Sequence, residues 1–240
     1  MLIGHIKSIL RYPVKSFSGE QIKKTNVMPY GLYGDRSHGL MDENRPGKFL
    51  TLTQWPEMVC YQAKFFGRES LEEYPQVQVK TPEGKTFIWG DQQLIQELEQ
   101  RSQRKVSPVN YRPDHVPLGA IEEEHIQLVT DASLTRLSEL WGREVDVRRF
   151  RPNFLIQLID FVPFIEDTWI GHRLKIGEQV ELEVKRHCER CMIITVNPAD
   201  GTRDPSLLKT VVRHRRNRFG VYATVVKTGV VVEGDPVVMI

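Results

Sequence analysis

The residues most suited to chemistry lie close together in the last third of the chain. Two of the three cysteines, Cys188 and Cys191, are separated by two residues, and Arg190 is one of these. A nearby guanidinium favours the thiolate form of a cysteine, which is the form that attacks electrophiles and binds soft metals. The pattern therefore predicts a reactive or metal-binding sulfur in this segment.

Two other interpretations of the cysteine pair have to be weighed. Structural zinc usually takes two such pairs, but the remaining cysteine, Cys60, lies alone in an apolar run, so a zinc site would need His187 or distant histidines. A thioredoxin-like dithiol lies at the start of a helix, whereas residues 192–196 have the β-branched character of a strand. Neither pattern is complete.

A second group of polar residues lies where predicted strands begin or end. Lys15 and Ser16 follow the first strand, Arg36 begins the third, and Arg151 and Asn153 precede an apolar strand. Arginines at a strand entrance project from the rim of a barrel, where a phosphate could accept bidentate hydrogen bonds. Clustered basic residues are also common on solvated surfaces, and the residues alone leave both interpretations open.

The rest of the pattern predicts a mainly β protein, because short apolar runs separated by Pro and Gly turns are typical of barrels and sandwiches. We expect strands at residues 2–10, 21–28, 36–41, 49–52, 58–65, 77–80, 86–89, 126–129, 154–159, 174–176, 180–184, 192–196 and 219–226, and a hairpin over 229–240. Apolar residues at helical spacing predict helices over residues 92–101, 131–141 and 206–213.

The helix over residues 131–141 has Asp131 as its predicted N-cap and Gly142 as its stop signal. Ser133 lies in its first turn, and a helix N-terminus can bind an anion or simply be capped. The segment 106–119 contains three prolines and predicts a linker. We therefore expect two regions, residues 1–115 and 116–240, whose strands could share one barrel.

Composition restricts the class of protein. Across 240 residues, 33 Lys and Arg balance 31 Asp and Glu, so no overall field favours nucleic acid or an anionic membrane. An odd number of cysteines argues against a disulfide framework and for a reducing compartment. No apolar run approaches the roughly 18 residues of a membrane span. We expect a cytoplasmic protein that binds neither nucleic acid nor membrane.

Taken together and in order, five motifs resemble one family. They are Tyr12-Pro-Val-Lys-Ser16, Gly34-Asp-Arg36, Thr130-Asp-Ala-Ser-Leu134, Arg149-Phe-Arg-Pro-Asn153, and Cys188-Glu-Arg-Cys191 followed by Thr195-Val-Asn-Pro198. The set resembles the MOSC superfamily, and more narrowly the branch with an N-terminal MOSC β-barrel region that includes the amidoxime-reducing components. The resemblance covers nearly the whole chain.

The resemblance implies a MOSC-type β-barrel with a β-rich N-terminal region, a few short helices and a molybdenum cofactor. In that cofactor, a pterin dithiolene binds the metal and carries a terminal phosphate. By motif match, Cys191 would be the catalytic residue and the thiolate ligand of molybdenum. The residues that would contact the cofactor are Lys15, Ser16, Arg36, Ser133, Arg151, Asn153 and Arg190.

The resemblance also implies an activity, the reduction of small N-hydroxylated compounds. The chain has no Rossmann-type glycine fingerprint, so we expect electrons from a separate flavin or haem protein. The basic residues 213–218 are the predicted docking place for its acidic surface. Because MOSC domains also occur fused to pyridoxal-phosphate cysteine desulfurases, Cys191 could instead carry a persulfide. Cofactor binding without turnover is a third alternative.

Overall fold

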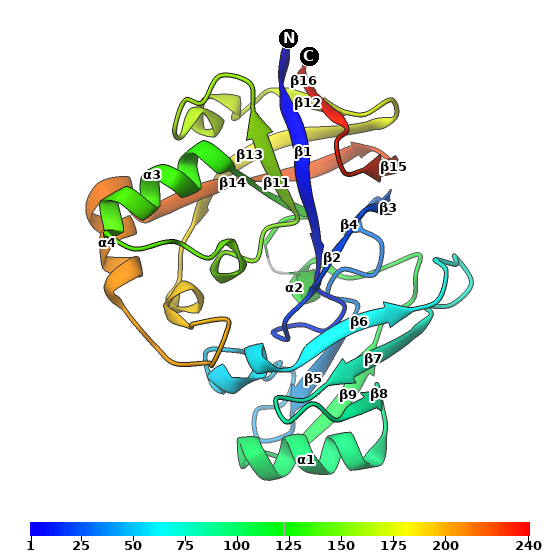
Figure 1. Ribbon diagram of the computed structural model, residues 1–240. Helices are drawn as coiled ribbons and strands as arrows, with labels where there is room; N and C mark the ends of the chain where they lie inside the picture. Colours follow the sequence, from blue (N-terminus) through cyan, green and yellow to red (C-terminus); the bar gives the residue numbers. More distant parts are fainter. Residues whose placement is uncertain (122) are drawn as a thin grey trace.

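The computed structural model describes residues 1–121 and 123–240, and it confirms a mainly β protein (Figure 1). Within these residues seven strands form a closed barrel, and the pairing of the first with the last strand of this order closes it. The order is β11 (Phe154–Leu158), β10 (Ile126–Thr130), β14 (Arg218–Lys227), β13 (Val180–Glu189), β12 (Arg173–Ile176), β16 (Pro236–Met239) and β1 (Leu2–Arg11). The short strand β2 (Glu20–Ile22) continues the sheet beyond β1.

The barrel is closed around an apolar interior. Alternate residues of its strands point inward, as the buried side chains of Ile6, Ile156, Leu182 and Val221 show. The strands β10 and β11 are parallel, whereas the other neighbouring pairs of the barrel are antiparallel. Apolar side chains from these strands therefore form the core of the barrel.

A second group of strands lies beside one end of the barrel (Figure 1). It comprises the sheet β15 (Gly229–Val232), β3 (Lys24–Met28), β4 (Gly31–Leu32), the pair β5 (His38–Asp42) and β9 (Val106–Asn110), and the sheet β6 (Gln62–Phe66), β7 (Gln76–Lys80), β8 (Thr86–Ile88). The helix α1 (Gln92–Ser102) packs here, with Leu94 and Leu98 buried in a separate apolar core.

The two regions share strands. Strand β1 comes from the N-terminal part of the chain but completes the barrel, and β15 comes from the C-terminal part but pairs with β3. The boundary near residue 115 stays a prediction.

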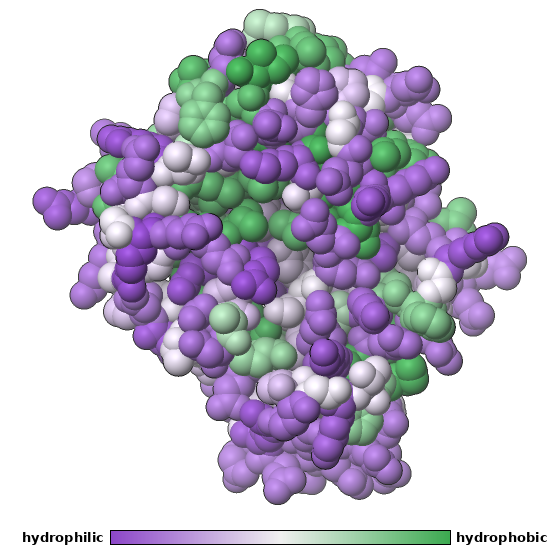
Figure 2. Space-filling model, viewed as in Figure 1, coloured by the Kyte–Doolittle hydropathy of each residue, from purple (hydrophilic) through white to green (hydrophobic). Residues whose placement is uncertain are grey.

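The longer helices of the second half pack on the outside of the barrel. Helices α3 (Asp131–Trp141) and α4 (Ser206–Arg215) cover an apolar cluster around Phe150 and Phe219. Helix α2 (Leu118–Ile121) is a single turn. None of the helices in the described part of the chain is both long and apolar enough to cross a membrane. Figure 2 shows a mainly hydrophilic face, with apolar residues gathered near the two chain ends.

Several local predictions are wrong. Residues 192–196 contain the 3-10 helix Met192–Thr195 instead of a strand, because the Ile194 side chain is buried in the same apolar cluster as Leu207 and Val211 of α4. The first part of the predicted strand 58–65 belongs to the 3-10 helix Pro56–Cys60, and only the rest forms strand β6. Residues 49–52 form only an isolated bridge. The N-cap of α3 is Thr130, whose hydroxyl accepts from the Ser133 N–H.

Two predictions of longer range are also wrong. The predicted linker 106–119 contains strand β9, which pairs with β5 despite Pro108 because β9 is an edge strand. The predicted hairpin 229–240 does not form, since its two strands, β15 and β16, join different sheets.

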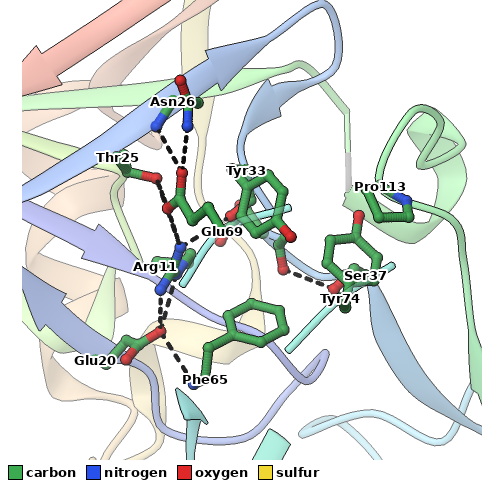
Figure 3. Close-up of polar contacts among 12 residues, drawn as sticks. Arg11, Glu20, Thr25, Asn26, Tyr33, Ser37, Phe65, Glu69, Tyr74 and Pro113 are labelled. Atoms are coloured by element: carbon green, nitrogen blue, oxygen red, sulfur yellow. Dashed lines mark hydrogen bonds and ion pairs between the residues drawn. The ribbon is translucent and has the colours of Figure 1, made fainter. Parts of the chain in front are cut away.

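A buried ion-pair network fixes the end of β1 (Figure 3). The Arg11 side chain pairs with Glu20 at 2.8 Å and with Glu69 at 2.7 Å. Glu69 also accepts hydrogen bonds from Thr25 Oγ1 at 2.6 Å and from the Asn26 backbone at 3.0 Å. A buried charge is tolerated when it is paired in this way. The network therefore holds the chain in place directly before the turn that begins at residue 12.

Candidate functional site

Two arginines from distant segments meet around one aromatic ring. The Cζ atoms of Arg36 and Arg151 lie 4.9 Å and 4.2 Å from the centre of the Tyr12 ring. Asp35 pairs with Arg36 and accepts a hydrogen bond of 2.8 Å from the Tyr12 backbone, and Arg36 Nη2 donates to the Arg151 carbonyl at 3.2 Å. Contact with the ring and these hydrogen bonds hold two buried cations side by side.

Lys15 and Ser16 belong to the turn that follows β1. Arg151 Nη1 donates to the Phe17 carbonyl at 2.8 Å, which ties this turn to the two arginines. Lys15 is 5% exposed, and its Nζ donates to the Ala120 carbonyl at 2.8 Å. The structure therefore brings together Lys15, Ser16, Arg36 and Arg151, which come from three separate segments. We call these four residues the cationic set.

The backbone of the cationic set is unusual. Among the described residues seven non-glycine positions have positive φ, and three of these are Ser16 (71°), Arg36 (52°) and Arg151 (55°). Such conformations cost of order 1–3 kcal/mol each and cluster at functional sites. Three of the predicted cofactor residues thus have backbone conformations that non-glycine residues rarely adopt.

Asn153 connects the cationic set to the barrel through hydrogen bonds. Its Nδ2 donates to Asp35 Oδ2 at 3.0 Å, and its Oδ1 accepts from the Gln127 backbone at 3.0 Å. Asn153 is buried, so these contacts connect Asp35 to barrel strand β10. Its side chain therefore positions Asp35 and, through Asp35, Arg36.

A cavity of about 550 Å³ opens beside the set and has Tyr12 and Arg151 in its wall. The rest of the lining comes from strand β1, residues 18–21, the segment 59–62 of the N-terminal region, residues 146–148 and residues 198–199. The cavity thus lies between the barrel and the N-terminal strands. Its volume is in the range of small-molecule and cofactor sites.

Cys191 lies on the adjoining loop. Its side chain is exposed and precedes the 3-10 helix Met192–Thr195. Arg149 Nη1 donates to the Ile194 carbonyl at 3.2 Å, and Ile193 and Arg151 line the same small cavity of about 10 Å³. The loop therefore borders the cationic set, although Cys191 is not one of the residues that line the large cavity.

The other cysteine has a different environment. Cys188 is fully buried, and burial raises the pKa of its thiol. Arg190 Nη1 contacts the Cys188 sulfur, while Arg190 Nη2 donates to the Phe150 carbonyl at 3.0 Å. Arg190 is thus turned toward Cys188, and the two thiols do not share one surface. In residues 1–121 and 123–240, no group of three or more His, Cys, Asp or Glu side chains is arranged to hold a metal ion.

The structure does not bring Ser133 into the set. Its hydroxyl donates to Glu166 Oε2 and accepts from the Phe164 backbone, each at 2.8 Å. The carboxylate next to the N-terminus of α3 is therefore the protein's own Glu166, and burial raises the pKa of this group. A role of Ser133 in cofactor contact stays a prediction.

Sequence reasoning missed two residues that organise the set, Tyr12 and Asp35. Both lie inside the quoted motifs, but they were not selected because neither offers a cation or a metal ligand. Tyr12 is buried between two guanidinium groups, and burial raises its pKa to about 12. The available signal was their position in those motifs, where Tyr12 lies three residues before Lys15 and Asp35 directly precedes Arg36.

Comparison with known proteins gives two family matches that together span most of the chain. The model of the MOSC N-terminal beta barrel domain matches residues 3–113, and the model of the MOSC domain matches residues 102–238.

Individual proteins are similar to this chain at modest sequence identity. Mitochondrial amidoxime-reducing component 1 of Danio rerio is 27% identical over 98% of this chain and 84% of that protein. Molybdenum cofactor sulfurase of Caenorhabditis elegans is 37% identical, over 42% of this chain but only 14% of that protein. Among solved structures, the YuaD protein from Bacillus subtilis has a TM-score of 0.52 at 14% identity, and the match covers 98% of this chain and 94% of that one. That likeness supports the fold alone.

Proposed function

We propose, from the premise that this chain belongs to the MOSC domain family, that it binds a molybdenum cofactor and reduces N-hydroxylated compounds. Family membership supports a function related to this cofactor. The reduction rests on the similarity to an amidoxime-reducing component over nearly the whole chain.

The observation that carries the proposal is the convergence of Lys15, Arg36 and Arg151 from three segments. A phosphate group needs several fixed cations and donors, and arginines supply these with a defined geometry. A second observation also fits an anionic cofactor. Arg190, next to Cys191, has a buried Nε without a hydrogen-bond acceptor in the described part of the chain. A buried donor without an acceptor is costly unless a ligand supplies one.

The site residues would have different roles in holding the cofactor. The cationic set would hold the phosphate and the pterin, while Asp35 and Asn153 would keep the arginines in place. Cys191 would supply a sulfur ligand from its exposed loop, and Arg190 would hold that loop from its buried side. The bound group supplies two-electron chemistry, and the protein supplies orientation and charge. Because Cys191 is exposed, a metal held by its sulfur would be accessible to a substrate from solvent.

Electrons would come from a separate flavin or haem protein with an acidic surface. Of the basic residues, Arg213 lies in the last turn of α4, Arg218 is the first residue of β14, and Arg216 lies in the turn between these elements. In this turn the Asn217 carbonyl accepts from the Arg190 backbone at 2.8 Å, so the basic surface adjoins the Cys191 loop. Charge complementarity would orient the donor on this side of the molecule.

Metal and phosphorus analysis of protein from a cofactor-competent host tests binding. We expect Cys191→Ala to lose molybdenum with unchanged thermal unfolding, because this side chain is exposed. Cys188→Ala should keep molybdenum but unfold at a lower temperature, because a buried thiol is removed. Equal loss of metal from both variants would indicate a dithiol or zinc site and would contradict the proposal.

Reduction of a model amidoxime with an artificial electron donor tests turnover. Full molybdenum content without reduction would leave a cofactor-binding protein. A persulfide carrier is the second candidate, because an exposed thiol is accessible for sulfur transfer and part of the chain is similar to molybdenum cofactor sulfurase. In that case mass spectrometry would find a persulfide on Cys191 in protein that lacks molybdenum.

A further inference from the structure

A second cavity lies in the N-terminal region, next to the turn that carries Lys15, since the carbonyl of its lining residue His38 accepts from the Lys15 backbone at 2.8 Å. It measures about 360 Å³, and none of its lining residues is shared with the 550 Å³ cavity. Its walls come from β5, residues 72–75 with the first two residues of β7, the end of β8 with residue 89, and the last residue of β9 with residues 111–113. The function proposed above makes no use of it.

Four aromatic rings line this cavity. They belong to His38, Tyr74, Trp89 and Tyr111. The centre of the His38 ring lies 5.5 Å from that of Tyr74 and 5.9 Å from that of Trp89, at interplanar angles of 55° and 85°. The three rings contact one another at steep angles and form one aromatic wall of the cavity. The faces of such rings carry negative potential and attract cations.

Hydrogen bonds fix the ring of Tyr74. Its hydroxyl donates to the Arg112 carbonyl at 3.1 Å and lies 3.1 Å from the Tyr30 hydroxyl. Pro75 and Pro113 form further parts of the wall. A rigid wall loses little conformational freedom on binding, and this favours a preformed site.

The charges at this cavity also favour a cation. Glu72 and Glu73 line it with exposed carboxylates. The single basic side chain in the lining is Arg112, which is 81% exposed and pairs with Asp114 at 3.4 Å. Burial lowers the pKa of His38 to about 4, so its ring is neutral near pH 7 and does not repel a cation.

We propose that this aromatic cavity binds a small organic cation, of the quaternary ammonium or methylated ammonium class. Its rings would surround the cationic head, and Glu72 and Glu73 would attract it from solvent. The inference is independent of molybdenum binding, because it concerns residues outside the cationic set and the Cys191 loop.

The test compares choline with its neutral isostere 3,3-dimethylbutan-1-ol, each followed by ligand-observed NMR on the full chain. We expect choline to bind about ten-fold more tightly, because the two molecules differ mainly in charge. Equal binding of the two molecules, or no binding of choline at millimolar concentration, would overturn the proposal.

Variants locate the site. Trp89→Leu keeps an apolar side chain but removes the aromatic face, and we expect it to weaken choline binding about ten-fold, whereas Trp89→Phe retains most of the affinity. The exposed pair Glu72→Gln and Glu73→Gln should weaken binding a few-fold at low salt and less at high salt. Thermal unfolding of each variant checks the fold. Unchanged affinity in both the folded Trp89→Leu protein and the double glutamine variant would place choline elsewhere and refute the assignment.

Discussion

At the scale of single residues, burial distinguishes two arginines that share the same backbone strain. Arg151 and Arg216 both have left-handed backbones, with φ of 55° and 51°. Arg151 is buried against Tyr12, whereas Arg216 is exposed at the C-cap of α4. The two positions therefore form a matched pair, because glycine relieves the same strain at both.

We predict that Arg151→Gly loses cofactor and that Arg216→Gly does not. A charge-assisted contact is worth about 1.5–3 kcal/mol, which corresponds to a roughly 10- to 150-fold weaker affinity. Phosphorus and pterin content after gel filtration measures retention. Equal retention by both variants would remove Arg151 from the cationic set.

Glu166 makes stability depend on pH in an unusual direction. Burial raises its pKa in the folded state above the ordinary value of 4.5, so the folded protein holds a proton that the unfolded chain releases. The stabilisation is full below pH 4.5 and is lost as pH rises through the folded-state pKa.

We therefore predict that Glu166→Gln flattens the decline in stability above pH 4.5, because glutamine carries no titrating proton. Its amide oxygen can still accept from Thr130 and Ser133, which donate to Glu166 in the native protein. Urea unfolding measured from about pH 5 to pH 8 gives the free energy of unfolding. Parallel pH profiles for the two proteins would show that Glu166 does not titrate in this range.

At the scale of elements, the contact of β1 with β11 closes the barrel and leaves no space for a side chain at Gly4. A Cβ at Gly4 would lie 2.3 Å from the Gln157 carbonyl oxygen, which is backbone and cannot move aside without shifting the strand. Apart from its chain neighbours and its own helix, Gly119 in α2 has no atom of the described residues within 4 Å of the corresponding position.

Gly4→Ala should consequently lower the free energy of unfolding by about 2 kcal/mol or more, within the upper range for overpacking. Gly119→Ala should be neutral or slightly stabilising, because alanine favours a helix. Denaturant unfolding of both variants compares them directly. A Gly4→Ala protein as stable as the wild type would mean that β1 and β11 are less tightly packed than the register indicates.

At the scale of the whole molecule, strand exchange between the two regions makes folding cooperative. Without residues 1–115 the barrel loses β1, and β16 and β11 lose their partner strand. The sheet of the N-terminal region in turn loses β15. Strand edges exposed in this way promote aggregation.

We predict that neither residues 1–115 nor residues 116–240 fold alone, and that co-expression of the two pieces restores a folded complex. Dispersion of amide signals in NMR spectra distinguishes these outcomes. A folded, monomeric fragment 116–240 would show that the barrel can close without β1.

Much of the molecule followed from the sequence alone. Short apolar runs and turn residues predicted the mainly β class and most strands, and apolar residues at helical spacing predicted the three longer helices, because these signals are local. The ordered motifs also identified the family and selected Lys15, Ser16, Arg36 and Arg151 before their proximity was known. Local patterns failed at residues 192–196, where β-branched residues favour a strand but packing against α4 bends the chain.

Other properties were decided only by the tertiary structure. Which of two neighbouring cysteines is exposed depends on the end of β13, where Cys188 turns inward and Cys191 leaves the sheet. The roles of Tyr12, Asp35 and Asn153 depend on contacts between segments more than a hundred residues apart. Side-chain types and turn signals are local properties of consecutive residues. Burial and long-range strand pairing depend on the packing of the entire chain.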